Sequence, residues 1–262
     1  MEISKAKLVY YSPTNTGKRI VTAIMQGTGL DYDYIDLTPP DSESKSYKVA
    51  KDELAIIAAP VYSGRIPAIA LDRIKKVTGD GTPAVLIAMY GNRHFDDALI
   101  ELKDVTSELG FKAVAGAAFI GRQSFDTPET PIAPSRPDGS DINKAKDFGA
   151  KVMEKIGGLT EVPELEVYGN RPYKEGGEGD PRSPETNPET CILCGMCARV
   201  CPTGCVEVTD SVKTDKTKCT ACTACVQNCP TGARHWEHPG IMGAAKWLAA
   251  ECSERREPEV FL

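Results

Sequence analysis

The cysteine residues constrain this chain more than any other feature of its sequence. Nine of the ten lie between Cys191 and Cys229, where the motif C-x2-C-x2-C-x3-C-P occurs twice, as CILCGMCARVCP and CTACTACVQNCP. The second copy follows the first at an offset of 28 residues, and both copies continue into Pro-Thr-Gly. The N-terminus, MEISKAKLVYY, carries charges where a secretory signal would be apolar. We therefore expect a metal site here and not a disulfide framework.

The spacing of the repeat predicts how the thiolates are shared between two [4Fe-4S] clusters. A tight loop presents three thiolates to three corners of a cubic cluster and then turns away, so that the fourth ligand comes from the other copy. The expected ligands are Cys191, Cys194, Cys197 and Cys229 for one cluster, called site I, and Cys219, Cys222, Cys225 and Cys201 for the other, called site II. A zinc site would need C-x2-C pairs separated by a long gap, and it would leave the third cysteine of each triplet unused.

Because the motif is present twice in register, residues 187–238 resemble a two-cluster bacterial-type ferredoxin domain. Cys205 stands where such domains usually have a small apolar residue, and we expect it to be a buried thiol near a cluster. Cys252 is expected to be a structural residue of a C-terminal helix. So small a domain has little core of its own, and cluster binding is expected to be its main source of stability.

The chain before residue 157 alternates short apolar runs with longer amphipathic ones. Strands are predicted over residues 6–11, 33–37, 54–60, 83–90 and 111–121, and helices over residues 18–26, 68–76, 96–109 and 141–155. Such alternation predicts a parallel sheet covered by helices on both faces. In sheets of this kind a ligand binds at the carboxyl ends of the strands, where the strand order reverses.

The segment SPTNTGKRI, residues 12–20, follows the first predicted strand and has the residue types of a phosphate-binding loop. It is not a nucleotide-hydrolase P-loop, because Arg19 follows Lys18 where a Ser or Thr would bind magnesium. The dinucleotide fingerprint G-x-G-x-x-G is missing as well. What remains is a loop of hydroxyl and backbone N–H groups at a helix N-terminus, which can bind a phosphate monoester without a metal.

With this loop in this position, the first domain resembles the flavodoxin-like fold, and most of the chain resembles the flavodoxin-ferredoxin fusion proteins. The resemblance implies FMN as cofactor and the strand order 2-1-3-4-5. It assigns the phosphate of FMN to Ser12, Thr14, Asn15, Thr16, Gly17 and Lys18. It assigns the isoalloxazine ring to the loops APVYSGRIP and YGNRHFDDAL, and within them to Pro60, Val61, Tyr62, Gly64, Arg65, Tyr90, Gly91 and Asn92, with Tyr62 as the stacking residue. The segment IGRQSF, residues 120–125, is expected to border the pocket.

We therefore expect an α/β protein with a flavodoxin-like five-stranded parallel sheet and a second, small α+β ferredoxin-like iron-sulfur domain. The expected boundaries are 1–157 for the FMN-binding domain, 158–186 for a linker, 187–238 for the two-cluster domain and 239–262 for a helical tail. The linker prediction follows from a stretch that is rich in Pro, Gly and acidic residues and has no hydrophobic period.

The composition argues against other classes of protein. The formal net charge of -6 and the lack of a Lys or Arg cluster argue against a nucleic-acid-binding protein. The longest apolar run, residues 54–62, is far shorter than the roughly 20 residues that a membrane span needs. We expect a cytoplasmic protein without a membrane span.

The expected function is electron transfer between FMN, two [4Fe-4S] clusters and external redox partner proteins. The alternative is a flavin-dependent oxidoreductase that reduces a quinone, a nicotinamide cofactor or another small molecule, with the clusters as its electron feed. No Ser-His-Asp set, carboxylate pair or catalytic-cysteine context indicates bond-making chemistry of the chain's own, which favours the electron carrier. The sequence leaves open whether flavin and clusters meet within one chain or across a homodimer.

Anaerobic reconstitution followed by cofactor analysis tests the cofactor assignments. Eight cysteine ligands and one phosphate loop predict about eight iron atoms and about one FMN per chain. Four iron atoms, tightly bound zinc or a lack of flavin would each contradict the corresponding assignment.

Overall fold

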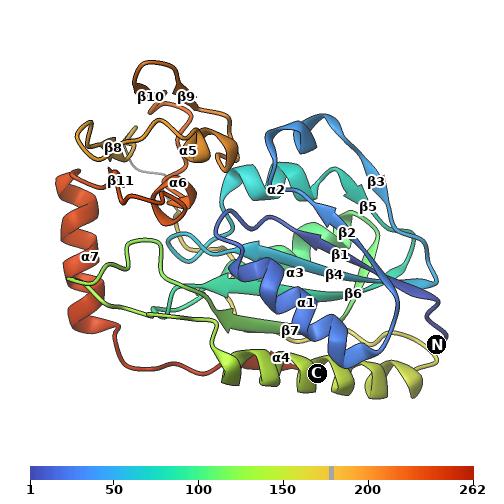
Figure 1. Cartoon of the computed structure of the whole chain (residues 1–262). Coiled ribbons are helices and arrows are strands. Elements are labelled where there is room, and N and C mark those ends of the chain that lie inside the picture. The colour runs from blue at the N-terminus through green and yellow to red at the C-terminus, as the bar shows by residue number, and fades with distance from the viewer. Residues whose placement is uncertain (177–179) are drawn as a thin grey trace.

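A parallel sheet forms the centre of the larger part of the molecule (Figure 1). The computed structural model describes residues 1–176 and 180–262. Five strands pair in parallel in the order β2-β1-β4-β6-β7, which is the predicted order 2-1-3-4-5. These strands are β1 (Lys5–Tyr10), β2 (Tyr32–Asp36), β4 (Glu53–Pro60), β6 (Thr82–Tyr90) and β7 (Phe111–Ile120). This part of the chain has the flavodoxin-like α/β fold.

Helices cover both faces of the sheet because its central strands are apolar on both sides. Strand β6 is buried along its whole length, as expected for a strand between two helical layers. On one face lie α1 (Thr16–Thr28) and α4 (Gly139–Gly157), and on the other lie α2 (Ala68–Ile74) and α3 (Ala98–Glu108). A 3-10 helix, η1 (Pro40–Ser44), and a short parallel pair, β3 (Tyr47–Lys48) with β5 (Val77–Thr78), complete this part.

Two glycines allow α1 and α4 to approach each other closely. A Cβ atom added at Gly149 would lie 2.0 Å from the carbonyl oxygen of Ile24, and one added at Gly27 would lie 1.9 Å from that of Lys146. Both distances are far shorter than a van der Waals contact, so a side chain at either position would push the helices apart.

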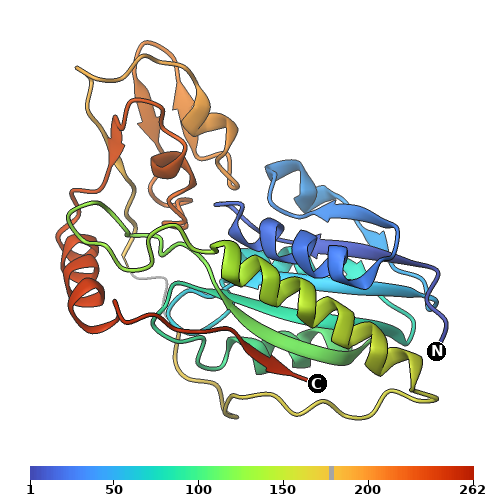
Figure 2. The same ribbon diagram turned by 60° about the horizontal axis from the view of Figure 1, so that its bottom comes forward.

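The C-terminal segment returns to the sheet and adds a strand that the sequence analysis missed. Helix α7 (Pro239–Glu251) was predicted, but the tail does not end as a helix, because β12 (Glu259–Phe261) pairs antiparallel with β7. The sheet therefore has six strands and not five. Figure 2 shows the tail running from α7 to the edge of the sheet.

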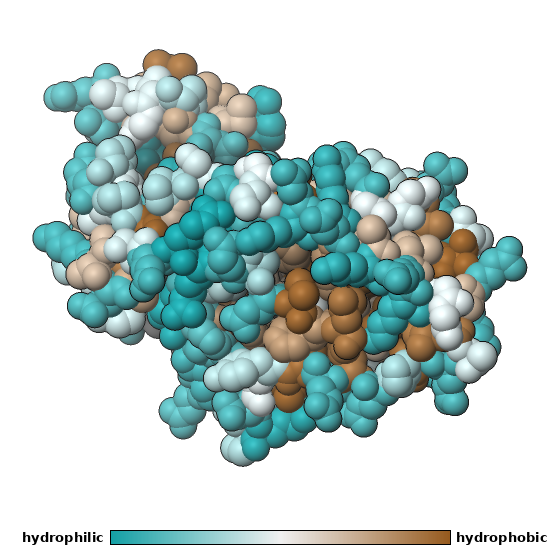
Figure 3. All heavy atoms as spheres, turned by 90° about the horizontal axis from the view of Figure 1, so that it is seen from below, coloured by the Kyte–Doolittle hydropathy of each residue, from teal (hydrophilic) through white to brown (hydrophobic). Residues whose placement is uncertain are grey.

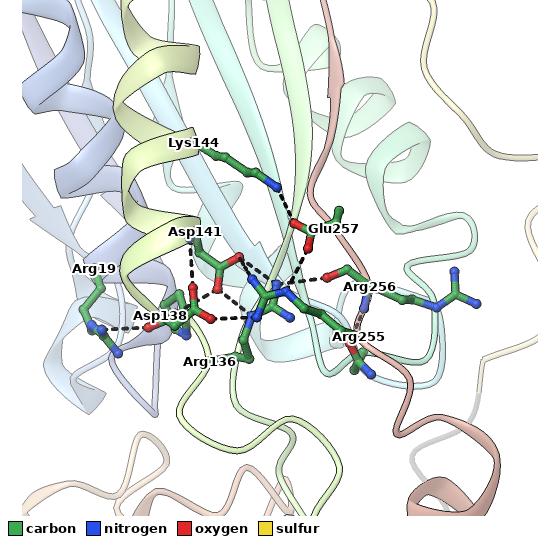
Figure 4. Close-up of polar contacts among 10 residues, drawn as sticks. Arg19, Arg136, Asp138, Asp141, Lys144, Arg255, Arg256 and Glu257 are labelled. Carbon is green, nitrogen blue, oxygen red and sulfur yellow. Dashed lines mark hydrogen bonds and ion pairs between the residues drawn. The ribbon is translucent and has the colours of Figure 1, made fainter.

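Ion pairs at the start of α4 hold this tail (Figure 4). Arg255 donates from Nη1 to the carboxylate of Asp138 at 2.7 Å, and this contact holds the pKa of Asp138 well below its ordinary range. The buried Arg136 pairs with the buried Asp141 and also donates to the carbonyl oxygen of Arg256 at 3.0 Å. The tail is thus fixed by its backbone and by its side chains.

The predicted linker is held against α3 over the part that the structure describes. The carboxylate of Asp97 accepts hydrogen bonds from the backbone N–H groups of Asn170, at 2.8 Å, and Lys174, at 2.7 Å. Asp104 forms an ion pair with Arg171. Residues 177–179 of the predicted linker lie outside the described residues.

The cysteine-rich unit repeats its backbone conformation as well as its sequence. Leu193 and Ala221, at equivalent positions of the two copies, both have φ of 52°, and Gly204 and Gly232 have φ of 63° and 70°. Its elements are α5 (Met196–Arg199), α6 (Ala224–Gln227) and two antiparallel pairs, β8 (Glu185–Thr186) with β11 (Arg234–His235) and β9 (Val206–Val208) with β10 (Val212–Thr214). Cysteine and valine side chains make up most of its small core.

The lower face of the molecule is mostly hydrophilic, with hydrophobic residues gathered near its centre and others toward its right side (Figure 3). The exposed large apolar side chains of the chain include Ile192 and Leu193 in the first cysteine loop and Met242 and Trp247 on α7. None of the helices in the described part of the chain combines the length and the hydropathy that a membrane crossing requires.

The variant Gly149→Ala tests the close contact of α1 and α4. We expect it to lower the free energy of unfolding by about 1–3 kcal/mol, because the added methyl group overpacks the contact. Gly157→Ala in the same helix is the matched control, since nothing lies within 4 Å of its added Cβ. Urea denaturation followed by circular dichroism measures both, and equal midpoints would contradict the close packing.

Candidate cofactor sites

One large cavity lies between the carboxyl end of the sheet and the cysteine-rich unit. Its volume is about 690 Å³, within the range of about 300–1,000 Å³ that is usual for small-molecule and cofactor sites. The loops after β1, β4, β6 and β7 form one side of it, and residues 216–221 and α7 form much of the other. It therefore lies where a parallel sheet of this strand order binds its ligand.

The loop after β1 stands at the N-terminus of α1, as predicted. Ser12, Thr14, Thr16 and Gly17 line the cavity. Ser12 Oγ accepts a hydrogen bond from the backbone N–H of Lys18 at 3.2 Å, so its own hydroxyl hydrogen can still be donated into the cavity. The first N–H groups of a helix have no partner within the helix, and they create a positive end that favours an anion.

Gly17 is adapted to this loop. A Cβ atom at this position would lie 3.2 Å from Ser12 Oγ, which is tighter than an ordinary contact. The absence of a side chain thus leaves room for Ser12 and for the helix N-terminus to face the cavity together.

Two residues of the predicted phosphate loop do not line the cavity. Asn15 is exposed and precedes the helix with a left-handed φ of 60°. The Lys18 ammonium lies 5.1 Å from the centre of the Tyr34 ring, and its backbone N–H is used by Ser12. These two residues are therefore not part of the cavity lining.

The loop after β4 forms a tight turn that brings Tyr62 to the cavity. Tyr62 and Arg65 exchange backbone hydrogen bonds of 2.9 and 3.1 Å, and between them Ser63 and Gly64 both have positive φ. A Cβ atom at Gly64 would lie 2.1 Å from Asp96 Oδ2, so only glycine fits there. Pro60, Val61, Tyr62 and Arg65 line the cavity, whereas Gly64 shapes the turn without lining it.

Arg65 is held at the cavity wall by a carboxylate. Its guanidinium donates to both oxygens of Glu101, at 2.6 and 2.9 Å. Glu101 is buried, and it also accepts the backbone N–H of Ile66 at 2.9 Å. The Arg65 charge is therefore already compensated within the protein.

The end of β6 and the loop after it contribute Tyr90 and Gly91 to the cavity but not Asn92. Tyr90 packs against Phe95, and burial raises the pKa of its phenol to about 12. The buried side chain of Asn92 is fully engaged by the tail: Nδ2 donates to the carbonyl oxygens of Cys252, at 2.6 Å, and Glu254, at 2.8 Å. The Asn92 side chain is thus held by the tail and does not line the cavity.

Residues that the sequence analysis did not select complete the cavity. Tyr11 from the sheet side and Thr220 from the cysteine-rich unit both line it, and their buried hydroxyl groups lie close to each other. Burial raises the pKa of Tyr11 and of Tyr62 well above the ordinary value. Residues 121–125, after β7, border the cavity as the segment IGRQSF was expected to do.

The eight predicted ligand cysteines line two further, smaller cavities. One contains Cys191, Cys194, Cys197 and Cys229, and the other contains Cys201, Cys219, Cys222 and Cys225. The grouping is the one that the spacing predicts for site I and site II. No three His, Cys, Asp or Glu side chains among the described residues form a site for a single metal ion.

Cys205 is a fifth thiol in the cavity of site II. It is buried, and its Sγ atom lies 3.5 Å from that of Cys201. Cys252 lies at the end of α7, where its carbonyl oxygen accepts the hydrogen bond from Asn92. Both positions agree with the structural roles expected from the sequence.

The cavities are arranged in a row. The large cavity and the cavity of site II share Cys219 and Thr220 as lining residues, and the cavities of site II and site I share Arg234. No described residue lines both the large cavity and the cavity of site I. Site II is thus the cysteine site next to the end of the sheet.

Arg73 fixes the cysteine-rich unit in this position. Its buried guanidinium donates to the carbonyl oxygens of Leu37, at 2.8 Å, and Thr38, at 2.6 Å, on the sheet side. It also donates to the carbonyl oxygen of Pro202, at 2.6 Å, directly after a predicted ligand of site II. Phe125 and Trp236 make a second contact between the two parts, with ring centres 6.2 Å apart.

Comparison with known protein families gives one match, between residues 190–233 and the family of 4Fe-4S dicluster domains. No curated protein matches the chain. Together with the fold of the sheet, this match shows that the chain combines a flavodoxin-like α/β unit with a small iron-sulfur domain. Such a combination supports a role in redox electron transfer.

Solved structures similar to the chain include several flavodoxins. A flavodoxin from the domain Archaea has 15% identity and a TM-score of 0.38, and the match covers 58% of this chain and 99% of that one. The flavodoxin of Streptococcus pneumoniae TIGR4 has 15% identity and a TM-score of 0.40, with 57% and 98% covered. The Fusobacterium nucleatum flavodoxin bound to flavin mononucleotide has 17% identity and a TM-score of 0.37, and the match covers 58% of this chain and 96% of that one. With TM-scores this low, the assignment of the fold depends on the strand order described above.

The two cysteines Cys205 and Cys222 provide a test of the ligand sets. Both are buried and line the same cavity, but only Cys222 is a predicted ligand. We expect Cys205→Ala to keep about eight iron atoms per reconstituted chain and Cys222→Ala to keep about four. Iron and sulfide analysis measures this difference, and loss of iron from the Cys205 variant alone would contradict the assignment.

Proposed function

We propose that this protein relays electrons between FMN in the large cavity, two [4Fe-4S] clusters and external redox proteins. One observation carries the proposal: Cys219 and Thr220 line the same cavity as the hydroxyl-rich loop after β1 and the tyrosines after β4 and β6. The flavin site and site II are then neighbours within one chain.

The residues of the large cavity fit FMN. Ser12, Thr14 and Thr16 offer hydroxyl groups at a helix N-terminus, where a phosphate dianion is stabilised by backbone N–H groups and by the helix dipole. Tyr62 and Tyr90 offer aromatic and apolar surface for a ring system. The buried hydroxyl groups of Tyr11 and Thr220 add polar atoms to the cavity wall that are suited to the polar edge of a bound cofactor.

The residues of the two smaller cavities fit iron-sulfur clusters. Each cavity has four predicted ligand cysteines, three from one loop and one from the other copy of the motif, as the spacing of two-cluster domains requires. Thiolates are the preferred ligands of such clusters.

The chemistry of the relay belongs to its cofactors: FMN exchanges one or two electrons, and each cluster exchanges one. The protein contributes position and exclusion of water. Arg73 and the tail keep the end of the sheet against the loop of site II, and Ile241 of α7 covers the cavity from the side. Direct transfer from the flavin to site II needs no second chain.

Site I is the proposed contact point with external redox proteins. Cys194 is exposed, and the side chains beside it, Ile192 and Leu193, are exposed as well, with 65% and 42% of their surface accessible. An exposed apolar loop around a redox centre is suited to transient docking. The proposed order is therefore flavin, site II, site I and partner protein.

Flash reduction of the flavin in the reconstituted full chain tests this order. We expect the clusters to become reduced at a rate that does not change over a tenfold range of protein concentration, because transfer occurs within one chain. Cys222→Ala, which removes a site II ligand, should abolish this transfer, whereas Cys194→Ala, its counterpart in site I, should leave the transfer from flavin to site II. A rate proportional to protein concentration, or the opposite result for the two variants, would contradict the proposal.

A further inference from the structure

Arg234 is a buried cation between the two cysteine cavities. Only 3% of its surface is accessible, and it lines both the cavity of site I and the cavity of site II. The short strand β11 holds it there by pairing antiparallel with β8, with Arg234 opposite Thr186. No other residue of the described chain lines both cavities.

The contacts of this guanidinium are with neutral groups. Nη1 donates to Thr186 Oγ1 at 2.7 Å, and Nη2 donates to Thr214 Oγ1 at 3.1 Å and to Cys225 Sγ at 3.7 Å. Nε is buried without a hydrogen-bond partner among the described residues. Among the described residues, no carboxylate forms an ion pair with Arg234. The buried Arg136, in contrast, is paired with Asp141.

A buried guanidinium without an anion is unfavourable, because it loses its hydration and gains no opposite charge in return. The groups that could supply the opposite charge are the thiolates around the two cavities. When four thiolates hold a [4Fe-4S] core, the assembly is an anion, and adding one electron makes it more negative by one unit without a proton. A cation between two such assemblies stabilises both, and it stabilises their reduced forms more.

We propose that Arg234 is the shared counter-charge of the two clusters and raises the reduction potential of both. This inference rests on the proposed function, since it requires that site I and site II are both filled. Little water intervenes at this depth, so the interaction is screened far less than that of a surface charge. Arg234 thus acts on the redox centres through its charge and not as a ligand.

Arg234→Gln in the reconstituted full chain tests this role. We expect the one-electron reduction equilibrium of the clusters to shift at least tenfold toward the oxidised form, which is about 59 mV in midpoint potential. Arg234→Lys, which keeps the charge, should show a reduction equilibrium much closer to that of wild type. Arg199→Gln is the matched control, because it removes the same charge from an exposed position on α5 and should change the equilibrium less than twofold.

Potentiometric titration monitored by electron paramagnetic resonance gives the potentials, and iron analysis gives the occupancy of the sites. Wild-type protein with fewer than two clusters would contradict the proposed function itself. If wild type and Arg234→Gln both hold two clusters and their one-electron reduction equilibria differ by less than twofold, only the role of Arg234 is overturned. If the Gln variant fails to hold both clusters while the Lys variant holds them, the need for a charge is supported. If both variants lose clusters equally, the inference is overturned.

Discussion

The hydrogen bonds of Arg73 join the two parts of the molecule at the point where the proposed cofactors meet. The guanidinium binds two carbonyl oxygens at the end of the sheet and one in the cysteine-rich unit, and it is buried between them. A planar group with five N–H donors can satisfy three carbonyls in a fixed geometry, which an ammonium group does less well. The position of site II relative to the large cavity depends on this contact.

The C-terminal tail and the predicted linker support the same arrangement from the outside. Asn92 binds the backbone after α7. Just before the strand that completes the sheet, the backbone of Arg256 accepts from Arg136, and the side chain of Arg255 pairs with Asp138. On the other side Asp97 binds the chain that leads into the cysteine-rich unit. The small unit, whose own core is mostly cysteine and valine, is therefore held at both of its chain ends by the larger one.

Local patterns allowed much of this to be predicted from sequence. The parallel strands follow from their apolar runs, and their order follows from the resemblance to the flavodoxin-like fold. The grouping of the eight cysteines follows from the spacing of the repeated motif. Ser12, Thr16 and Tyr62, which line the large cavity, were selected because their loops directly follow strands. Arg73, Tyr11 and the strand β12 were not found, since each acts on a segment more than 100 residues away or across the boundary between the two parts, and no local pattern marks such a contact. The contacts of the Asn92 side chain with the tail were not predicted for the same reason: its loop lies beside both the cavity and the tail, and the sequence does not say which one receives the side chain.

The central claim is that site II stands between the flavin cavity and site I within a single chain. Crystals of the reconstituted protein, with the iron located by anomalous scattering, test it most directly. We expect a flavin between the loop after β1 and Cys219, and two iron clusters, of which the one held by Cys201, Cys219, Cys222 and Cys225 is nearer to the flavin. A flavin outside this cavity, or a nearer cluster held by Cys191, Cys194, Cys197 and Cys229, would contradict it.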